Sequence, residues 1–379
     1  MSKKNVLLAT RPLVPPWDEA SKNFAYFLAR NISSPEIEVH ILTTPKELAN
    51  LGERVVAHPL YKTKSVAAKH SFLEKALLPI YLFFQGFRYD IIHYLFTPTR
   101  FNAFILKNFI FGRTRTIQTV ATLREDLYKT TNLRALFFAD KLVTYTERTK
   151  EKLKNLGFHN VACIYPGIDL EKFRPQPKDP QVLAQLGFNE KHFIVSYAGE
   201  YARLGATDMI ADAFIDFFQK NPETNIRLVF PGRVKNAADA EMKAKIEKLF
   251  TAAHLLQYVH FPPSIIMDIV GLYNTSDLIL FPVANLEGKF DVPLVIIEAY
   301  ACGRPVILSD LPQFREFTNE RICVTIPKDS GAKLIESVAY LKDNQAVREA
   351  LGREARAFVK QHFDLKNTAM QYENIYNSL

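Results

Sequence analysis

The chain has 379 residues, of which 48% are apolar and 12% aromatic, so it holds material for two hydrophobic cores. Its three cysteines, Cys163, Cys302 and Cys323, are too far apart for a disulfide framework or a zinc site, and we expect a reduced, cytosolic protein. No stretch approaches the ~20 consecutive apolar residues of a membrane span. Residues 1–175 carry 26 Lys and Arg against 15 Asp and Glu. This excess suits an anionic lipid, nucleic acid or phosphorylated substrate, and is also typical of a solvated surface.

Short apolar runs alternate with helical patterns along the whole chain. In the first half the pattern predicts helices near residues 19–32 and 148–156, and strands at residues 5–9, 39–42, 91–94, 116–120 and 141–145. A second series of strands is predicted at residues 193–198, 226–230, 259–261, 278–281, 306–308 and 323–326. This alternation indicates an α/β protein with two doubly wound parallel sheets.

The junction between the two halves is marked by turn and proline residues. Residues 165–175 are rich in turn formers, and the three prolines in residues 175–180 cannot continue a helix or a central strand. We therefore expect domains at residues 1–175 and 176–360. A last helical region, interrupted near residue 362, leaves residues 361–379 as a terminal helix.

The segment from Phe290 to Ile307 combines a loop, a short helix with one carboxylate, and a turn into an apolar strand. Pro293 suits the start of a helix, whose free N-terminal amides form an anion site. Glu298 follows about one turn later, where a carboxylate accepts hydrogen bonds from sugar or ribose hydroxyls. The alternative is an ordinary loop–helix–strand unit with a solvated glutamate.

Four blocks, at residues 139–146, 165–175, 197–200 and 290–306, together resemble a family four glycosyltransferase of the GT-B fold. The resemblance implies two Rossmann-like domains facing a central cleft, with the last helix packing back toward the first domain. Such enzymes hold a nucleotide diphosphate sugar mostly on the second domain and an acceptor on the first. They usually transfer the sugar with retention and without a metal or another cofactor.

Three residues of the fourth block are donor-binding candidates by this resemblance. Glu298 would bind the donor's ribose hydroxyls, and the backbone amides of Leu294 and Val295 would face the diphosphate. The side chains of Leu294 and Val295 are expected to pack, so this prediction concerns their main chain only.

The diphosphate also needs cations, because negative charge grows on the leaving group. Relatives place an Arg and a Lys in the loop after the strand that opens the second domain, which here begins at Gly199. Glu200 stands where the usual Arg would be, so Arg203 is our candidate. Gly232 permits a tight turn near the base, and Arg233 would meet the base or a phosphate. A surface arginine and a plain strand-to-loop turn are the alternatives.

The sequence departs from the family where the transferred sugar should bind. The usual first glutamate falls on Phe290, which has no carboxylate. We favour Asp291 in its place, with Glu287 as the other candidate. Arg203, Asp291 and Glu298 are therefore the expected catalytic residues.

The first domain lacks the histidine that many relatives carry after a central strand. Arg124 and Glu125 stand in the corresponding loop, where they would face an acceptor or cap the next helix. In the first loop, Trp17 would stack on a sugar, and Asp18 would bind a hydroxyl or begin the following helix.

Residues 61–88 mix basic with aromatic and aliphatic side chains, which is typical of a segment lying on an anionic membrane. A core helix with a solvated basic turn is the alternative, and Pro79 counts against one uninterrupted helix. We expect a cytoplasmic protein, peripheral on the inner face of the membrane, that does not bind nucleic acid.

The sequence thus predicts a glycosyltransferase that moves a sugar from a nucleotide diphosphate sugar to a glycan or lipid-linked acceptor. Synthesis of a surface polysaccharide is the expected setting. A non-hydrolysing nucleotide-sugar epimerase and a catalytically silent GT-B binding protein are the alternatives, and Phe290 and the missing histidine leave the second of them open.

Overall fold

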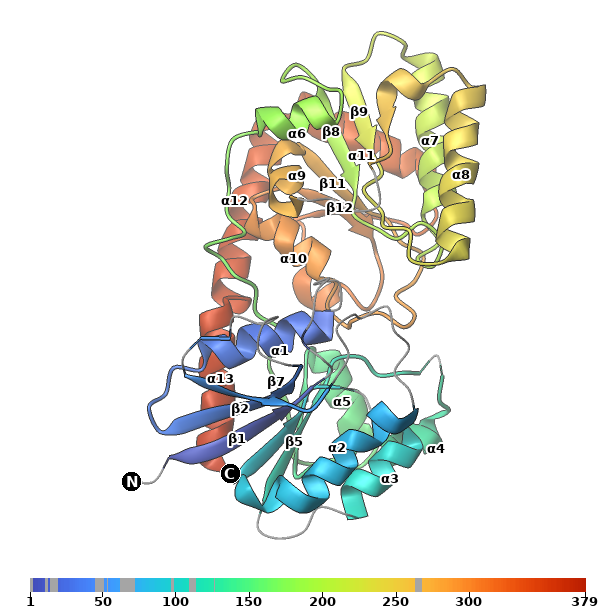
Figure 1. Cartoon of the computed structure of the whole chain (residues 1–379). Coiled ribbons are helices and arrows are strands. Elements are labelled where there is room, and N and C mark those ends of the chain that lie inside the picture. Colours follow the sequence, from blue (N-terminus) through green and yellow to red (C-terminus); the bar gives the residue numbers. More distant parts are fainter. Residues whose placement is uncertain are drawn as a thin grey trace. The chain divides into compact units, whose positions relative to one another are not determined.

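The computed structural model describes residues 3–10, 13, 20–44, 51–52, 54–61, 72–96, 99–108, 114–125, 127–262 and 268–379. These residues form two compact units, shown in Figure 1. Residues 1–167, 288–292 and 363–379 form the first unit, and residues 168–287 and 293–362 form the second. The expected boundary near residue 175 thus lies a few residues inside the second unit.

The first unit is built on a seven-stranded parallel sheet, with the strand order β3-β2-β1-β4-β5-β6-β7. Its strands are β1 (Lys4–Ala9), β2 (Ile37–Thr43), β3 (Val55–Pro59), β4 (Ile91–Tyr94), β5 (Arg115–Val120), β6 (Lys141–Thr144) and β7 (Val161–Cys163). Its helices are α1 (Ala20–Asn31), α2 (Phe72–Gln85), η2 (Gly86–Arg88), α3 (Arg100–Asn108), α4 (Thr130–Leu133), η3 (Arg134–Leu136), α5 (Glu147–Asn155) and α13 (Leu365–Ser378).

Alternating side chains of the central strands serve two different helical layers. Ile92 and Tyr94 of β4 join one buried cluster with residues of α2 and α3. The residue between them, His93, points to the other face, where its ring stacks on Tyr372 of α13 at 5.3 Å. A parallel sheet covered on both faces explains why the side chains on both faces of β4 are buried.

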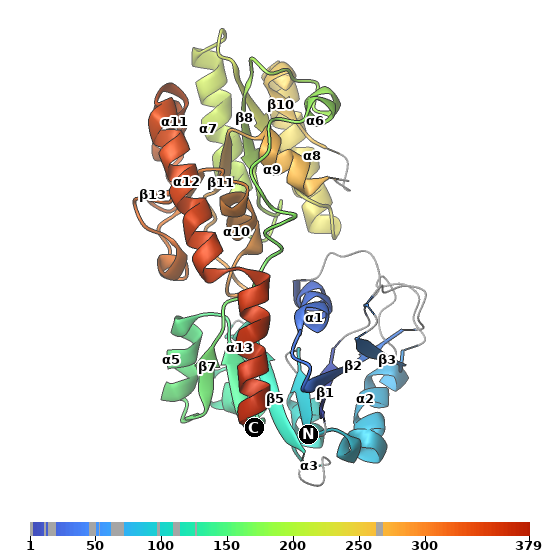
Figure 2. The ribbon, with the colours of Figure 1, turned by 90° about the vertical axis from the view of Figure 1, so that its left-hand side faces the viewer.

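Helix α13, visible beside the first sheet in Figure 2, is held by buried hydrogen bonds. The Nδ1 atom of His93 lies 2.7 Å from the hydroxyl of Tyr376, and its Nε2 atom lies 2.7 Å from the hydroxyl of Thr119. The helix begins at Asp364, whose side chain accepts a hydrogen bond from the amide of Lys366. Residues 363–379 therefore belong to the first unit.

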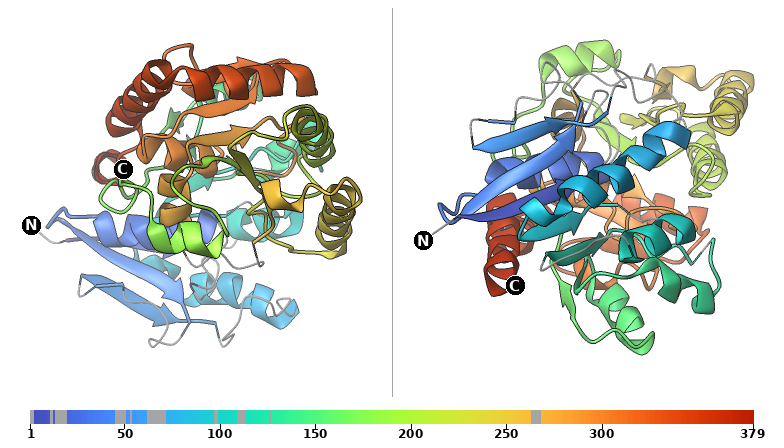
Figure 3. Two further views of the ribbon diagram at one scale, coloured as in Figure 1. Left: turned by 90° about the horizontal axis from the view of Figure 1, so that it is seen from above. Right: turned by 60° about the horizontal axis from the view of Figure 1, so that its bottom comes forward.

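The second unit has a six-stranded parallel sheet, with the order β10-β9-β8-β11-β12-β13. Its strands are β8 (Phe193–Tyr197), β9 (Ile226–Val229), β10 (Val259–His260), β11 (Leu278–Phe281), β12 (Val306–Ser309) and β13 (Val324–Ile326). Its helices are α6 (Pro180–Gln185), α7 (Thr207–Lys220), α8 (Ala237–Ala252), η4 (Leu256–Tyr258), α9 (Ile269–Thr275), α10 (Leu294–Ala301), η5 (Arg315–Phe317), α11 (Gly331–Asp343) and α12 (Gln345–His362). Figure 3 gives two further views of the helices around each sheet.

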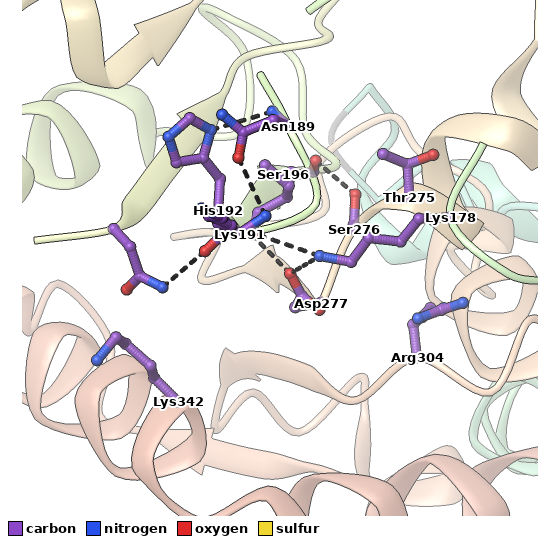
Figure 4. Close-up of polar contacts among 12 residues, drawn as sticks. Lys178, Asn189, Lys191, His192, Ser196, Thr275, Ser276, Asp277, Arg304 and Lys342 are labelled. Atoms are coloured by element: carbon purple, nitrogen blue, oxygen red, sulfur yellow. Dashed lines mark hydrogen bonds and ion pairs between the residues drawn. The ribbon is translucent and has the colours of Figure 1, made fainter. Parts of the chain in front are cut away.

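The proline-rich segment is tied to the amino ends of β8 and β11 (Figure 4). Lys178 Nζ lies 2.6 Å from a carboxylate oxygen of Asp277, which also accepts a hydrogen bond from the amide of Ile194 at 2.7 Å. The same Nζ atom donates to the carbonyl of His192. These contacts hold the proline-rich segment at the end of the second sheet where β8 and β11 begin.

The predicted α/β architecture with two doubly wound parallel sheets is confirmed, and the break near residue 362 separates α12 from α13. Two strands were not predicted, β3 and β7, and both are edge strands. An edge strand pairs on one side only, so β3 carries His58 and Pro59. Three residues suffice for β7, which is too short to give a periodic signal.

We expect His93 to make the first unit sensitive to acid. Burial lowers the pKa of His93 from 6.5 to about 3. Below pH 6.5 the unfolded chain therefore binds a proton that the folded chain does not, and the unfolding free energy falls by at most ~1.4 kcal/mol per pH unit between pH 6.5 and 3. Urea denaturation between pH 7.5 and 5 should show this slope, and His93→Gln should flatten it.

The exposed His159 offers a control for loss of a histidine, since His159→Gln should keep the wild-type slope. An unchanged slope in His93→Gln would contradict a neutral, buried His93.

Candidate functional site

The residues expected to bind the donor lie beyond the carboxyl ends of three neighbouring strands of the second unit. Strand β8 pairs with β9 on one side and with β11 on the other, and the chain order reverses between β8 and β11. Open parallel sheets bind ligands outside the carboxyl ends of the strands at such a switch point. The loops after β8 and β9, and helix α10 after β11, meet at this edge.

Helix α10 presents a free N-terminus and one carboxylate. It begins after Pro293, and no side chain caps its first turn, in which Leu294 and Val295 are partly exposed. Glu298 lies one turn further along, where it accepts a hydrogen bond from the hydroxyl of Tyr273 on α9 at 3.0 Å. The helix N-terminus and the carboxylate thus lie in one place, as the sequence predicts.

The carboxyl group of Glu298 sits in an unfavourable environment for a charge. Burial raises its pKa from 4.5 to about 7, although the hydrogen bond from Tyr273 and the charge of Lys172 act in the opposite direction. Near neutral pH the group therefore exists in both forms. A carboxylate held in such surroundings is typical of a functional site.

Two cations converge on Glu200, in the loop after β8. Arg203 binds it through Nε at 2.8 Å and a terminal nitrogen at 3.1 Å, and Lys235 Nζ lies 2.9 Å from its Oε1 atom. The side chain of Glu200 is 11% exposed, whereas those of Arg203 and Lys235 are 45% and 40% exposed. The group of three therefore offers a net positive charge to solvent.

Asp239, in the first turn of α8, joins the loops that carry these cations. Its buried carboxylate accepts a hydrogen bond from the amide of Ala202 at 3.3 Å and another from the amide of Lys235 at 3.2 Å. Gly232 also lets the loops approach, because a Cβ atom there would lie 2.9 Å from the ring of Tyr201. A Cβ atom at Gly199 would likewise clash with the side chain of Tyr197, so neither glycine leaves room for a side chain. Arg233 is exposed, in the same loop as Lys235.

The loop with the candidate sugar-binding carboxylate belongs to the first unit. Asp291 accepts a hydrogen bond from the hydroxyl of Thr149 at 2.5 Å, and its amide donates to the carbonyl of Ala121 at 3.1 Å. Burial raises the pKa of Asp291 to about 6. Phe290 packs on Tyr145, with the ring centroids 5.0 Å apart.

Glu287, the other candidate carboxylate, is exposed in the second unit. The structure gives Asp291 a hydrogen-bonded position in the first unit, and its sugar-binding role stays a prediction.

The candidate acceptor residues are described only in part. Glu125 is exposed and paired with Lys152, and the carbonyl of Arg124 accepts hydrogen bonds from the two amides that follow its turn. Both residues follow β5 and come just after Ala121 and Thr122, which hydrogen-bond to Asp291 and Lys289. Trp17 and Asp18 lie outside the described residues.

Sequence reasoning missed three residues of this site, which are Lys235, Tyr273 and Asp239. Lys235 follows Arg233 by two residues, so a search for any cation after β9 finds it. Tyr273 and Asp239 act through contacts between elements that are distant in sequence, and no local pattern marks them.

Two family models match the chain and together take in most of it. Residues 22–172 match the model described as Glycosyltransferase Family 4, and residues 179–358 match the model Glycosyl transferases group 1.

Curated relatives carry a glycosyltransferase name. A D-inositol 3-phosphate glycosyltransferase of Arthrobacter is 27% identical over 242 residues, which cover 62% of this chain and 55% of the relative. One of Streptomyces bingchenggensis is 30% identical over 180 residues, which cover 46% of this chain and 38% of the relative. The chain thus spans about half, or less, of the length of the curated relatives it matches.

Solved structures share the fold along the whole chain. HepE of Anabaena, crystallised with UDP and glucose, has a TM-score of 0.76 at 16% identity, and 99% of each chain is covered. Sucrose-phosphate synthase of Thermosynechococcus elongatus has a TM-score of 0.76 at 18% identity, again with 99% of each chain covered. With the two family models together spanning most of residues 22–358 and the shared fold, the chain belongs to the family 4 glycosyltransferases and has the GT-B fold.

Proposed function

We propose that this protein transfers a sugar from a nucleotide diphosphate sugar to a glycan or lipid-linked acceptor, with retention and without a metal or other cofactor. The observation that carries the proposal is the free N-terminus of α10 with Glu298 one turn behind it, at the switch point of the second sheet. Amides suit a phosphate, and a carboxylate suits a ribose.

In this proposal each group of the second unit binds one part of the donor. Glu298 accepts hydrogen bonds from the ribose hydroxyls, and the amides of Leu294 and Val295 face the diphosphate. Arg203 and Lys235, held together by Glu200, stabilise the charge that develops on the diphosphate as the glycosidic bond breaks. The acceptor oxygen then bonds to the anomeric carbon on the face from which the nucleotide diphosphate departs, and the acceptor's hydroxyl proton passes to a phosphate oxygen of that leaving group, so no enzyme nucleophile is needed.

UDP-glucose is the first donor to test. HepE of Anabaena was crystallised with UDP, with UDP-glucose, and with UDP and glucose. In our proposal this chain, which has a similar fold, takes the same donor, with Glu298 at the ribose and the loops after β8 and β9 at the phosphates.

We place the acceptor on the first unit, where Arg124, Glu125 and Asp291 are the candidate contacts. A lipid-linked acceptor places the protein in the cytoplasm, at the inner face of an anionic membrane, in the synthesis of a surface polysaccharide. Incubation with UDP-glucose alone tests the assignment as a transferase. Change of the donor without an acceptor would indicate an epimerase, whereas donor binding without turnover across an acceptor panel would indicate a silent binding protein.

We predict that Glu298→Gln separates donor binding from stability. The folded carboxyl has a pKa of about 7 against an ordinary 4.5, so the folded chain retains a proton between these two pH values, and above pH 7 it holds a charge in a desolvated position that destabilises the fold. Removing this group should leave the ligand-free melting temperature at pH 8 equal to or above that of the wild type. The rise in melting temperature on adding UDP should be largely lost, because the ribose loses its acceptor.

The exposed Glu287 provides the matched control, since Glu287→Gln should keep the wild-type response to UDP. A Glu298→Gln protein that responds to UDP like the wild type would remove Glu298 from the donor site.

Arg203→Gln and Lys235→Gln should weaken UDP binding by about tenfold each, with little effect on uridine. A charge-assisted hydrogen bond contributes ~1.5–3 kcal/mol, and only the diphosphate would receive it. Isothermal titration calorimetry measures both ligands. Lys220→Gln removes an exposed lysine that is paired with Asp216 on α7, and it should bind UDP normally. Equal losses for uridine and UDP would place the two cations elsewhere than at the diphosphate.

A further inference from the structure

Six large apolar side chains are exposed on one layer of the first unit. They come from α2, η2 and α3, and we call them the aromatic face: Ile80, Phe83, Phe84, Phe87, Phe101 and Phe104. Each is between 46% and 68% exposed. The other large exposed apolar residues in the described part of the chain come from separate elements: Val56, Leu127, Leu256, Tyr340 and Met370. A concentration of this kind marks an interaction surface.

Helix α2 is apolar on two opposite sides. Leu78 and Leu82 point inward and are buried in the cluster that contains Tyr94. Ile80, Phe83 and Phe84 are spaced at i, i+3 and i+4, which places them on one outer stripe of the helix, and Phe87 follows in η2. The core of the unit packs against the inner side of the helix, and the outer stripe is exposed.

Helix α3 repeats the pattern beside it. Ala103 and Leu106 are buried, whereas Phe101 and Phe104 are exposed. The two helices contact one another and lie next to each other in Figure 1. The exposed side chains of the two helices therefore lie on neighbouring elements of one layer.

The charge around the aromatic face selects its partner. Among the described side chains of residues 77–108, Arg88, Arg100 and Lys107 are basic and exposed, whereas Asp90 is the one acidic residue. The guanidinium carbon of Arg88 lies 6.0 Å from the ring centroid of Phe87, and Arg100 directly precedes Phe101. A second copy of this chain would bring like charges together, which is unfavourable. Anionic headgroups over an apolar layer complement both features at once.

We propose that the aromatic face inserts into the headgroup region of an anionic membrane and holds the first unit on it. The proposal identifies the surface that would contact the membrane. It rests on the proposed function only in that the bound protein would reach a lipid-linked acceptor there. No helix in the described part of the chain is long and apolar enough to cross a bilayer. The helices lie along the side of the sheet, so docking there leaves the carboxyl ends of the strands open.

Vesicle co-sedimentation tests the proposal with the full chain. Wild-type protein should bind vesicles of about 30% phosphatidylglycerol in phosphatidylcholine, because their anionic headgroups attract basic segments. The variant Phe84→Gln/Phe87→Gln/Phe104→Gln should lower the partition coefficient by about tenfold or more, because membrane binding scales with the apolar area buried. Glutamine is a good helix former, so the helices should persist.

The matched control replaces three exposed apolar residues outside the aromatic face, in Leu256→Gln/Tyr340→Gln/Met370→Gln, and should bind like the wild type. Arg100→Gln/Lys107→Gln should weaken binding to anionic vesicles, and high salt should do the same, because salt screens exposed charges. Both triple variants should keep the wild-type melting temperature and its rise with UDP. This readout reports the donor site separately from the membrane.

Three results would overturn the proposal. Wild-type protein that stays in solution with anionic vesicles has no such surface. Aromatic variants that bind vesicles as tightly as the wild type place the membrane contact elsewhere. A wild-type dimer in sedimentation equilibrium that becomes a monomer in the aromatic variant, with no vesicle binding by either, would assign the face to a second copy.

Discussion

Parallel strand pairing limits where this protein can place polar chemistry. The described strands of both sheets run parallel, and the central ones are buried on both faces, so most of their side chains are apolar, and polar ones such as His93 and Thr119 are hydrogen-bonded inside the unit. Groups that bind a charged ligand must then come from the loops beyond the strand ends. Because all the strands point the same way, the carboxyl ends of β8, β9 and β11 bring their loops to one edge. The candidate donor site follows from this geometry before any particular side chain is considered.

Two largely buried carboxylates, those of Glu298 and Glu200, determine the electrostatics of that edge. Glu298 has a pKa near neutral because it is desolvated, and Glu200 is nearly buried between two cations. An unpaired buried carboxylate is unfavourable for folding, and hydrogen bonds from Tyr273 and from the cations reduce that cost. Arg203 and Lys235 come from neighbouring loops and both pair with Glu200, so the three side chains together keep one net positive charge.

The sequence predicts most of the fold and the local parts of the site, for identifiable physical reasons. Helix α10 and Glu298 are a local pattern, since proline, free amides and carboxylate lie within one helical turn. Lys235 joins Arg203 only because β8 and β9 are adjacent, and adjacency is a property of the fold. The assignment of residues 288–292 to the first unit is likewise invisible in the sequence, where they lie between residues of the second. Edge strands β3 and β7 escape prediction because one-sided pairing relaxes the demand for apolar residues.

The aromatic face and the buried carboxylates are related departures from what folding alone favours. A sequence optimised only for stability would place Phe84 and Phe87 inside and keep a carboxylate such as Glu298 in solvent. Both departures stand on elements whose opposite sides are well packed, namely α2 over the first sheet and α10 over the second. Rigid packing on one side lets the other side carry an unfavourable group without loss of the fold. The two features serve different partners, since one offers apolar area to a layer of lipid and the other offers hydrogen bonds to a polar ligand. The candidate functional surfaces of this protein are thus the places where a well-packed element carries a group that is unfavourable for folding, either an exposed aromatic side chain or a buried carboxylate.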